Sequence, residues 1–434
     1  MNFESKGNQS SAPYASFDHW IGGRNLPSWS TNAGAEPLAF QGWRHFKEAY
    51  APELVRRAIA ESQVKVRHCL DPFGGSGTTA LACQFSGVRP TTIEVNPYLA
   101  DLIEAKLVPY NAREIARDYA LLVRKANAKR PDPHKIFSAA PRTFVEPGVQ
   151  ERWIFDHEVA SRLAAYLVAL KHIVDPNNQR LLRVILGGVL IETSNVIVSG
   201  KGRRYRTGWQ GRRHTASDLD EAFAEALERA VGDIVRYANR REQSYKVLRG
   251  DARRLLARVG PIDLAVFSPP YPNSFDYTDV YNVELWGLGY LDSSVSNASL
   301  RQSTLSSHVQ LARRFAPAPA GSSLLDETLS ALGEVRSKLW DRRIPEMVAG
   351  YFQDLIRVVR QVARRLPQSG QIWLVVGDSG YAGVRIPVSE ILTQLVMHVE
   401  CDVLLQEPFR SMRASAQQGR EFSLAETLLV LNRR

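Results

Sequence analysis

The segment Ser268–Pro269–Pro270–Tyr271 combines residue types that suit chemistry on an aromatic amine. The hydroxyl of Ser268 and the backbone carbonyl of Pro269 can each accept a hydrogen bond from an amino group, and the proline rings stiffen the turn. Tyr271 offers a flat face on which an extruded base can stack. The lone pair of an exocyclic amino nitrogen of cytosine or adenine is delocalised into the ring, and two fixed acceptors would localise it for attack on a methyl sulfonium. We therefore predict that these four residues are catalytic.

Pro-Pro-Tyr also occurs in loops and in polyproline-type ligands. Here it directly follows the apolar run 263–267, which is typical of a buried strand, and an exposed ligand motif seldom has that position. The chemistry requires neither a metal ion nor a covalent nucleophile, and the sequence offers no good candidate for either.

A glycine-rich turn, DPFGGSGTTA at 71–80, lies between a predicted strand and a predicted helix, and Glu94 follows about twenty residues later. Glycine lets the backbone approach a ligand closely, and Glu94 can accept two hydrogen bonds from a ribose diol. This pattern matches the dinucleotide fingerprint, so a nicotinamide cofactor and any other adenosine-containing cofactor fit equally. A turn with a purely structural role is the remaining alternative.

Two details favour S-adenosylmethionine. Asp71 and Phe73 place a carboxylate and an aromatic ring beside the pocket, where a cationic amino-acid group rather than a pyrophosphate could be held. The second detail is the segment 268–271, which suits methyl transfer. We predict that the turn from Asp71 to Thr78 binds this cofactor together with Glu94.

A basic stretch at 199–214, SGKGRRYRTGWQGRRH, contains no acidic side chain and interleaves Tyr205 and Trp209. Cationic side chains can neutralise phosphates or pair with guanine edges, and aromatic rings can stack or wedge between bases. A solvated basic loop without a ligand is the alternative. We predict DNA contacts for Lys201, Arg203, Arg204, Arg206, Arg212 and Arg213.

About seven predicted strands alternate with helices along the chain, which is typical of an open, mostly parallel sheet covered on both faces. Both motifs directly follow strands, so we expect them at the same rim of the sheet. Long amphipathic helices between the two motifs predict an inserted helical lobe, a possible target-recognition region. The expected organisation is a loose tail (1–17), a catalytic domain in two parts (18–106 and 245–434), the helical insert (107–244), and an extended loop (292–323).

DPFGGSGTT and the later SPPYPNSFDYTDVYNVELWGLGY resemble the amino-methylating DNA methyltransferases of bacteria and phages, particularly the SPPY type associated with N4-cytosine methylation. The resemblance extends to GDA (250–252), VVGDSGYAGVRIP (375–387) and ETLLVLN, and covers most of 40–434 outside the insert. It implies a Rossmann-like methyltransferase fold, S-adenosylmethionine as cofactor and duplex DNA as substrate. Cytosine N4 is favoured, whereas Phe267, where such enzymes often carry threonine, and the order of the motifs leave adenine N6 open.

Residue by residue, the resemblance implies that Phe73, Gly75 and Gly77 line the cofactor pocket and that Asp251 accepts from the adenine amino group. FKEAYAPELV (46–55) occupies the place where the family contacts the methionine end of the cofactor. A restriction or phage-defence partner would fit such an enzyme. An RNA guanine-N2 methyltransferase, a nicotinamide oxidoreductase and a catalytically silent DNA-binding protein remain the alternatives.

Composition agrees with a nucleic-acid partner. The 434 residues carry a net charge of +10, and clustered Lys and Arg displace counterions from nucleic acid. Three widely spaced cysteines indicate neither a disulfide framework nor a zinc site. Because there is no signal-peptide pattern and no run of eighteen apolar residues, we expect a cytoplasmic protein without a membrane partner.

Overall fold

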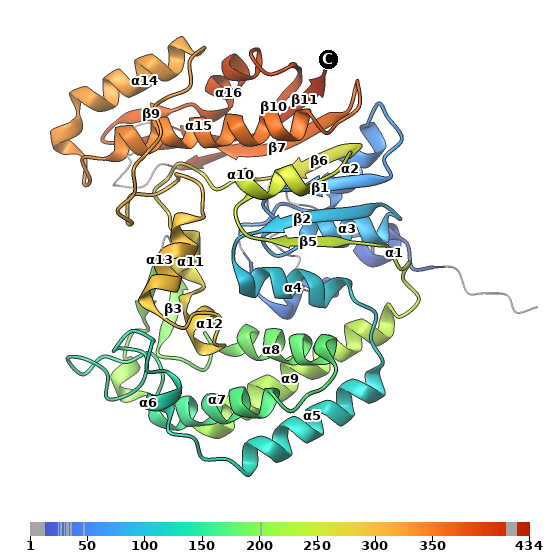
Figure 1. The fold of residues 1–434 in the computed structure, drawn as a ribbon, viewed down its shortest axis with the longest axis vertical. Helices are drawn as coiled ribbons and strands as arrows, with labels where there is room; N and C mark the ends of the chain where they lie inside the picture. Colours follow the sequence, from blue (N-terminus) through green and yellow to red (C-terminus); the bar gives the residue numbers. More distant parts are fainter. Residues whose placement is uncertain are drawn as a thin grey trace, which may run out of the picture.

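The computed structural model describes residues 14–434, apart from 25, 27, 30, 32–33, 35–36, 47, 200–201 and 414–422. The described residues form a central seven-stranded sheet with helices on both faces, and a helical lobe beside it (Figure 1). The strands of this sheet are β1 (His68–Asp71), β2 (Arg89–Glu94), β5 (Lys246–Arg249), β6 (Leu264–Phe267), β7 (Gln371–Gly377), β10 (Cys401–Arg413) and β11 (Ser423–Arg433).

The strand order is β10-β11-β7-β6-β1-β2-β5. Neighbouring strands from β5 to β7 pair in parallel, whereas β11 is antiparallel to both β7 and β10. The chain first builds outward from β1 to β2 and β5, and then outward from β6 to β7, so the order reverses between β1 and β6. Ligands of such sheets bind beyond the carboxyl ends of the strands at this switch point. The predicted doubly wound, mostly parallel α/β fold is confirmed.

Apolar cores on both faces explain why the strands read as continuous apolar runs. Val266 and Trp373 enter one core, and their neighbours Phe267 and Leu374 enter the other. The first face is covered by α1 (Phe17–Ile21), α2 (Pro52–Glu61), α3 (Thr78–Phe85) and α4 (Pro97–Leu107). The second face is covered by α10 (Ala252–Leu255), α14 (Ser323–Glu334), α15 (Ile344–Ala363) and α16 (Val388–Val396).

A helical lobe connects α4 to β5 and lies below the sheet in Figure 1. It packs on the sheet domain through contacts between α8 and α4, so its apolar core continues that of the first face. The lobe consists of α5 (Ala112–Asn127), α6 (Pro133–Ile136), α7 (His157–Leu170), α8 (Pro176–Val189), the hairpin of β3 (Val196–Ser199) and β4 (Gly202–Tyr205), η2 (Trp209–Gly211) and α9 (Ala216–Arg236). The hairpin and the non-helical segment 137–156 depart from the helical pattern expected for 107–244.

The remaining elements are η1 (Gln41–Trp43), η3 (Leu256–Arg258), α11 (Tyr277–Val280), α12 (Asn282–Gly287), α13 (Ser294–Gln302), η4 (Arg336–Lys338) and the hairpin of β8 (Ser379–Tyr381) and β9 (Val384–Ile386). Within the described part of the chain, no helix has both the length and the apolar character needed to cross a membrane.

Two predicted boundaries were wrong. The tail was expected to reach residue 17, but Ala15 pairs with Arg240, Ser16 caps α1, and Phe17 is buried. Residues 1–13 lie outside the described residues. The extended loop expected at 292–323 contains α13, which begins with a capping box at Ser293. This helix has no buried residue, so it lacks the apolar periodicity by which a helix is predicted.

Candidate active site

A cavity of about 360 Å³ lies at the rim where β1, β2 and β6 end. It is lined by the glycine turn, the end of β2, the start of α10, the turn after β6, the segment 46–50 and the loop 303–308. Ten of the predicted site residues line it together: Asp71, Phe73, Gly75, Thr78, Glu94, Asp251, Ser268, Pro269, Pro270 and Tyr271. The expectation that the two motifs share one rim is confirmed.

The glycine turn exposes its backbone toward the cavity. Gly75 has a φ of +51°, and a β-carbon there would lie 3.0 Å from the ring of Phe46, so a side chain would be both strained and crowded. Gly77, also predicted to line the pocket, is not among the lining residues. Its φ is +85°, and a β-carbon would lie 2.9 Å from Ile103 of α4. Gly77 therefore allows close packing of α3 on α4 rather than contact with a ligand.

Glu94 ends β2 with its carboxylate held by two backbone amides. Oε2 accepts from the N–H of Gly75 at 2.7 Å, and Oε1 accepts from the N–H of Asn96 at 2.8 Å. Burial raises the pKa of Glu94 to about 7, because these amides only partly replace the lost water. The carboxyl of Glu94 thus lies at the strand end where a group that binds a ribose is expected. With this pKa it gains or loses its proton near neutral pH.

Asp71 is the second buried carboxyl of the cavity. Burial raises the pKa of Asp71 to about 6, opposed by hydrogen bonds that include one from the N–H of Phe73 at 2.9 Å. Tyr50 lies next to it and donates to the carbonyl of Val266 at 3.2 Å. Its hydroxyl also bonds that of Thr79. Segment 46–50 is thereby fixed against both β1 and β6.

A buried ion pair anchors the same segment from its other side. Arg44 Nη2 lies 2.7 Å from Glu284 Oε1 of α12, and neither side chain is more than 9% exposed. Phe46 stacks on Tyr281 with ring centroids 6.0 Å apart. Removing one partner of such a pair leaves an uncompensated buried charge, which typically costs about 3–5 kcal/mol of folding free energy. The pair therefore fixes one aromatic wall of the cavity.

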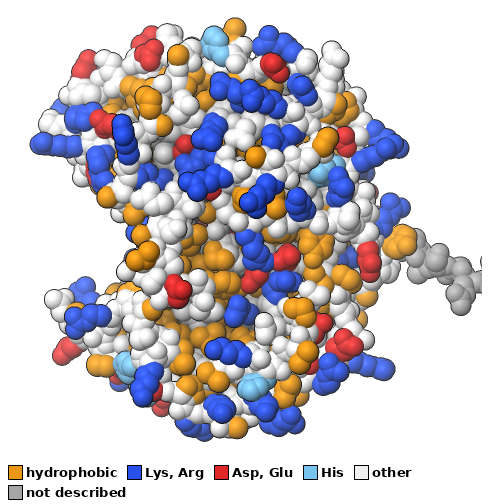
Figure 2. Space-filling view, in the orientation of Figure 1, with side chains coloured by type: hydrophobic (Ala, Val, Ile, Leu, Met, Phe, Trp, Pro, Cys, Tyr) orange, Lys and Arg blue, Asp and Glu red, His pale blue; other side chains and the backbone are white. Residues whose placement is uncertain are grey.

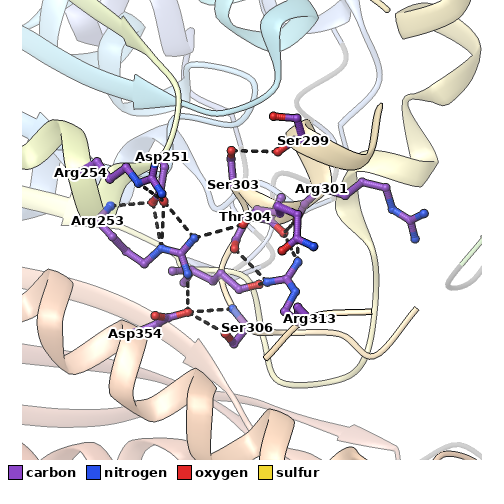
Figure 3. Close-up of polar contacts among 12 residues, drawn as sticks. Asp251, Arg253, Arg254, Ser299, Arg301, Ser303, Thr304, Ser306, Arg313 and Asp354 are labelled. Atoms are coloured by element: carbon purple, nitrogen blue, oxygen red, sulfur yellow. Dashed lines mark hydrogen bonds and ion pairs between the residues drawn. The ribbon is translucent and has the colours of Figure 1, made fainter. Parts of the chain in front are cut away.

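Asp251 caps α10 and is engaged by an arginine, in addition to lining the cavity. Arg253 donates from Nη2 to Asp251 at 2.9 Å and from Nη1 to Asp354 at 2.7 Å. Asp354 also accepts from the N–H and hydroxyl of Ser306, at 3.0 and 2.8 Å. Figure 3 shows this chain of contacts from α10 through α15 to the loop 303–308. These contacts therefore hold the loop 303–308 near the part of the cavity that Asp251 lines.

Tyr271 is held by groups that the sequence did not reveal. Its hydroxyl donates to Glu426 Oε1 at 2.7 Å, and Arg410 Nε donates to Glu426 Oε2 at 2.6 Å. Ser268 Oγ lies 3.4 Å from the same hydroxyl. Gly377 stands opposite Glu426 in the β7–β11 pair, and a β-carbon there would lie 2.4 Å from the tyrosine ring. A carboxylate two residues before the apolar run 428–431 is the sequence signal that could have indicated Glu426.

Asp276 organises the loop after the segment 268–271 through several contacts. This aspartate caps α11, accepts from Arg301 Nε at 2.6 Å and lies 3.9 Å from His308. Burial lowers the pKa of His308 to about 4, so a neutral imidazole lines the cavity at physiological pH. Asp276 thus supports the cavity wall through Arg301.

Two arginines of the basic stretch make contacts within the lobe, although Arg213 is also exposed. Arg206 donates to the carbonyls of Ser194 and Ile191, at 3.0 and 2.9 Å. Arg213 pairs with two carboxylates, those of Glu146 and Asp156, at 2.7 and 2.8 Å. Both therefore hold the lobe together, a role that the prediction of DNA contacts did not include. Of the other residues predicted to contact DNA, Arg204 and Arg212 are exposed, Arg203 is half-buried, and Lys201 lies outside the described residues.

The sheet order and the cavity at its switch point define a Rossmann-like fold of the methyltransferase class. No family model matches the chain. The chain is 26% identical over 411 residues to "Type II methyltransferase M.AvaI" of Nostoc sp. strain PCC 7120, which covers 87% of this chain and 82% of that protein. It is 25% identical over 425 residues to "Type II methyltransferase M.BsoBI" of Geobacillus stearothermophilus, with coverages of 86% and 80%.

Among solved structures, TrmN from Thermus thermophilus is 8% identical with a TM-score of 0.28, covering 88% of this chain and 49% of that one. The rRNA methyltransferase AviRa from Streptomyces viridochromogenes is 12% identical with a TM-score of 0.29, with coverages of 88% and 85%. The sequence relatives, similar over most of both chains, support a methyltransferase.

Proposed function

We propose that the protein is a site-specific DNA methyltransferase that transfers a methyl group from S-adenosylmethionine to the exocyclic amino group of a flipped base, cytosine N4 in preference to adenine N6. The observation that carries the proposal is that segment 268–271 and the glycine turn with Glu94 line one cavity. The relatives named type II methyltransferases support the same reading and a restriction-modification setting.

The cavity residues fit S-adenosylmethionine. A volume of about 360 Å³ is in the range of small-molecule sites, which are typically about 300–1,000 Å³. Glu94 would accept hydrogen bonds from the ribose diol, Phe73 would flank the adenosine, and Asp71 would attract the cationic amino-acid end. Bound there, the cofactor supplies an electrophilic methyl group on a sulfonium. Asp251, whose carboxylate Arg253 engages through its backbone N–H and its guanidinium, would lie beside the adenine amino group.

The protein's own residues would hold the base amino group. Ser268 Oγ and the carbonyl oxygen of Pro269 would each accept a hydrogen bond from one N–H of the amino group. These two bonds would localise the nitrogen lone pair and direct it toward the methyl group. Tyr271 offers its ring for stacking, which typically contributes about 1–3 kcal/mol per base and offsets much of the cost of unstacking. Because Glu426 fixes the tyrosine hydroxyl, the ring is oriented before the base arrives.

The helical lobe is the proposed target-recognition region, with Arg203, Arg204 and Arg212 as its candidate DNA contacts. Their side chains are exposed or half-buried, and none forms an ion pair recorded among the described residues. Exposed guanidinium groups are suited to phosphates and to guanine edges in the major groove.

The deciding experiment incubates the protein with labelled S-adenosylmethionine and diverse duplex DNA, then digests the DNA to nucleosides. We expect N4-methylcytosine, with an initial rate of formation at least about tenfold lower in the matched control reaction with Ser268→Ala. N6-methyladenine would correct the base, whereas absence of both products across all DNA would overturn the function. Parallel reactions with RNA, and calorimetry with NAD, test the guanine-N2 methyltransferase and oxidoreductase alternatives.

A further inference from the structure

A second hollow, of about 1110 Å³, lies between α10, η3 and the C-terminal half of α15. Figure 2 shows Lys and Arg side chains gathered over this part of the molecule. Among the described residues that line it are seven arginines and one acidic residue, Asp263. The carboxylate of Asp263 is already hydrogen-bonded within the protein, because its Oδ2 accepts from the backbone N–H groups of Arg67 and His68 at 2.8 and 2.9 Å.

Three of these arginines form a stripe on α15. Arg357, Arg360 and Arg364 are spaced three and four residues apart, so they project from one helix face. All three are exposed, and no ion pair is recorded for them within the described part of the chain. Burial lowers the pKa of the neighbouring Arg365, and repulsion from Arg364 lowers it further. An anion in the hollow would relieve this repulsion.

We propose that this arginine groove binds the phosphate backbone of duplex DNA outside the catalytic cavity, independently of sequence. The seven residue steps from 357 to 364 rise about 10 Å along the helix axis, and one DNA strand presents a phosphate every ~3.4 Å of axis, so the stripe spans about three phosphates. The described lining contains no aromatic residue, which disfavours single strands that bind by stacking. The DNA assignment rests on the proposed function.

The groove shares α10 with the catalytic cavity and extends from there toward the amino ends of β6 and β7, where Ile262 and Arg433 line it. Asp251 and Ala252 line the cavity, whereas the next residues, Arg253 and Arg254, line the groove. The short helix α10 therefore separates the two hollows. Contacts between the groove and the phosphate backbone of DNA would increase affinity. They would hold the enzyme on DNA while different bases enter the catalytic cavity.

The test measures duplex affinity by fluorescence anisotropy over a range of salt for the wild-type protein and the variant R357Q/R360Q/R364Q. Each phosphate contact contributes about 0.9 to the slope of log affinity against log salt, so the slope should fall by about 2.7 and affinity at 0.1 M salt by at least about tenfold. The matched control is R113Q/R117Q/R124Q, which removes three exposed charges from α5, a helix of the lobe that contains none of its candidate DNA contacts Arg203, Arg204 and Arg212. It should alter the slope by less than about 1.

The variant R357K/R360K/R364K should retain the wild-type slope, because lysine also neutralises phosphate. Equal melting temperatures and equal affinity for S-adenosylhomocysteine would establish that the glutamine variant is folded. Three results would overturn the proposal that the groove binds duplex DNA. They are an unchanged salt slope in the glutamine variant, an equal loss of slope in the α5 control, and preferential binding of duplex RNA through these arginines. Failure of the wild-type protein to methylate any DNA would instead overturn the proposed function.

Discussion

Replacing Gly377 by alanine should inactivate the enzyme by displacing Tyr271. The new β-carbon would lie 2.4 Å from Cε2 and 2.7 Å from Cδ2 of the tyrosine, whereas ordinary contacts lie at 3.4–4 Å. Gly377 is paired with β11, so its backbone resists movement and the ring must retreat. A displacement of about 1 Å in an active site costs on the order of 100-fold in rate. The shift also weakens the 2.7 Å hydrogen bond to Glu426.

Steady-state methyl transfer to duplex DNA would measure the effect, with calorimetry of S-adenosylhomocysteine as the second readout. We expect kcat to fall about 100-fold while the Kd of the cofactor product changes less than about threefold. Gly232→Ala in α9 is the matched control, because its β-carbon would meet no atom within 4 Å. Wild-type kcat in Gly377→Ala would refute the role assigned to the tyrosine ring.

Three further changes test other parts of the molecule. Ser268→Ala should lower kcat at least about tenfold with cofactor affinity unchanged, measured by steady-state kinetics and calorimetry; unaltered turnover would contradict the amino-group clamp. Burial raises the pKa of Glu94 from its usual 4.5 to about 7. The protonated carboxyl therefore contributes fully to the stability of the folded protein below pH 4.5, and this contribution is lost as pH rises through 7. The melting temperature of the ligand-free protein should therefore fall over that range, and Glu94→Gln should flatten the fall; parallel profiles would argue against it. Neutralising Arg204 and Arg212 should reduce the salt slope of DNA binding by up to about 0.9 each. Arg206→Gln should instead lower the melting temperature, because it removes the guanidinium hydrogen bonds to the carbonyls of Ser194 and Ile191.

The parts of the fold that the sequence predicted are those with local signals. The helix predicted after the glycine turn begins at Thr78, and the apolar run 263–267, predicted as a buried strand, contains β6. The glycine turn marks the start of the first element, and the continuous apolar pattern marks the second. The proximity of the two motifs was also predictable, because both follow parallel strands whose carboxyl ends share a rim.

The missed features depend on contacts between distant residues. Glu426 and Tyr271 are 155 positions apart, and Arg213 and Asp156 are 57 apart. Neither pairing leaves a local pattern in the sequence. The basic stretch was taken as one surface because charge is visible in a sequence, whereas the buried carboxylates and carbonyls that engage some of its cations are not. Gly77 was assigned to the pocket for a similar reason, since its contact with Ile103 is tertiary.

The position of β11 between β7 and β10 has a consequence for the order of assembly. During synthesis β7 and β10 emerge before β11, yet neither pairs with the other, so the edge of β7 remains open until β11 inserts. Pairing of these late residues also delivers Glu426 to Tyr271. A partly folded chain can therefore form its glycine turn early, but it cannot orient the tyrosine until the sheet is closed. This order delays base capture until folding is complete.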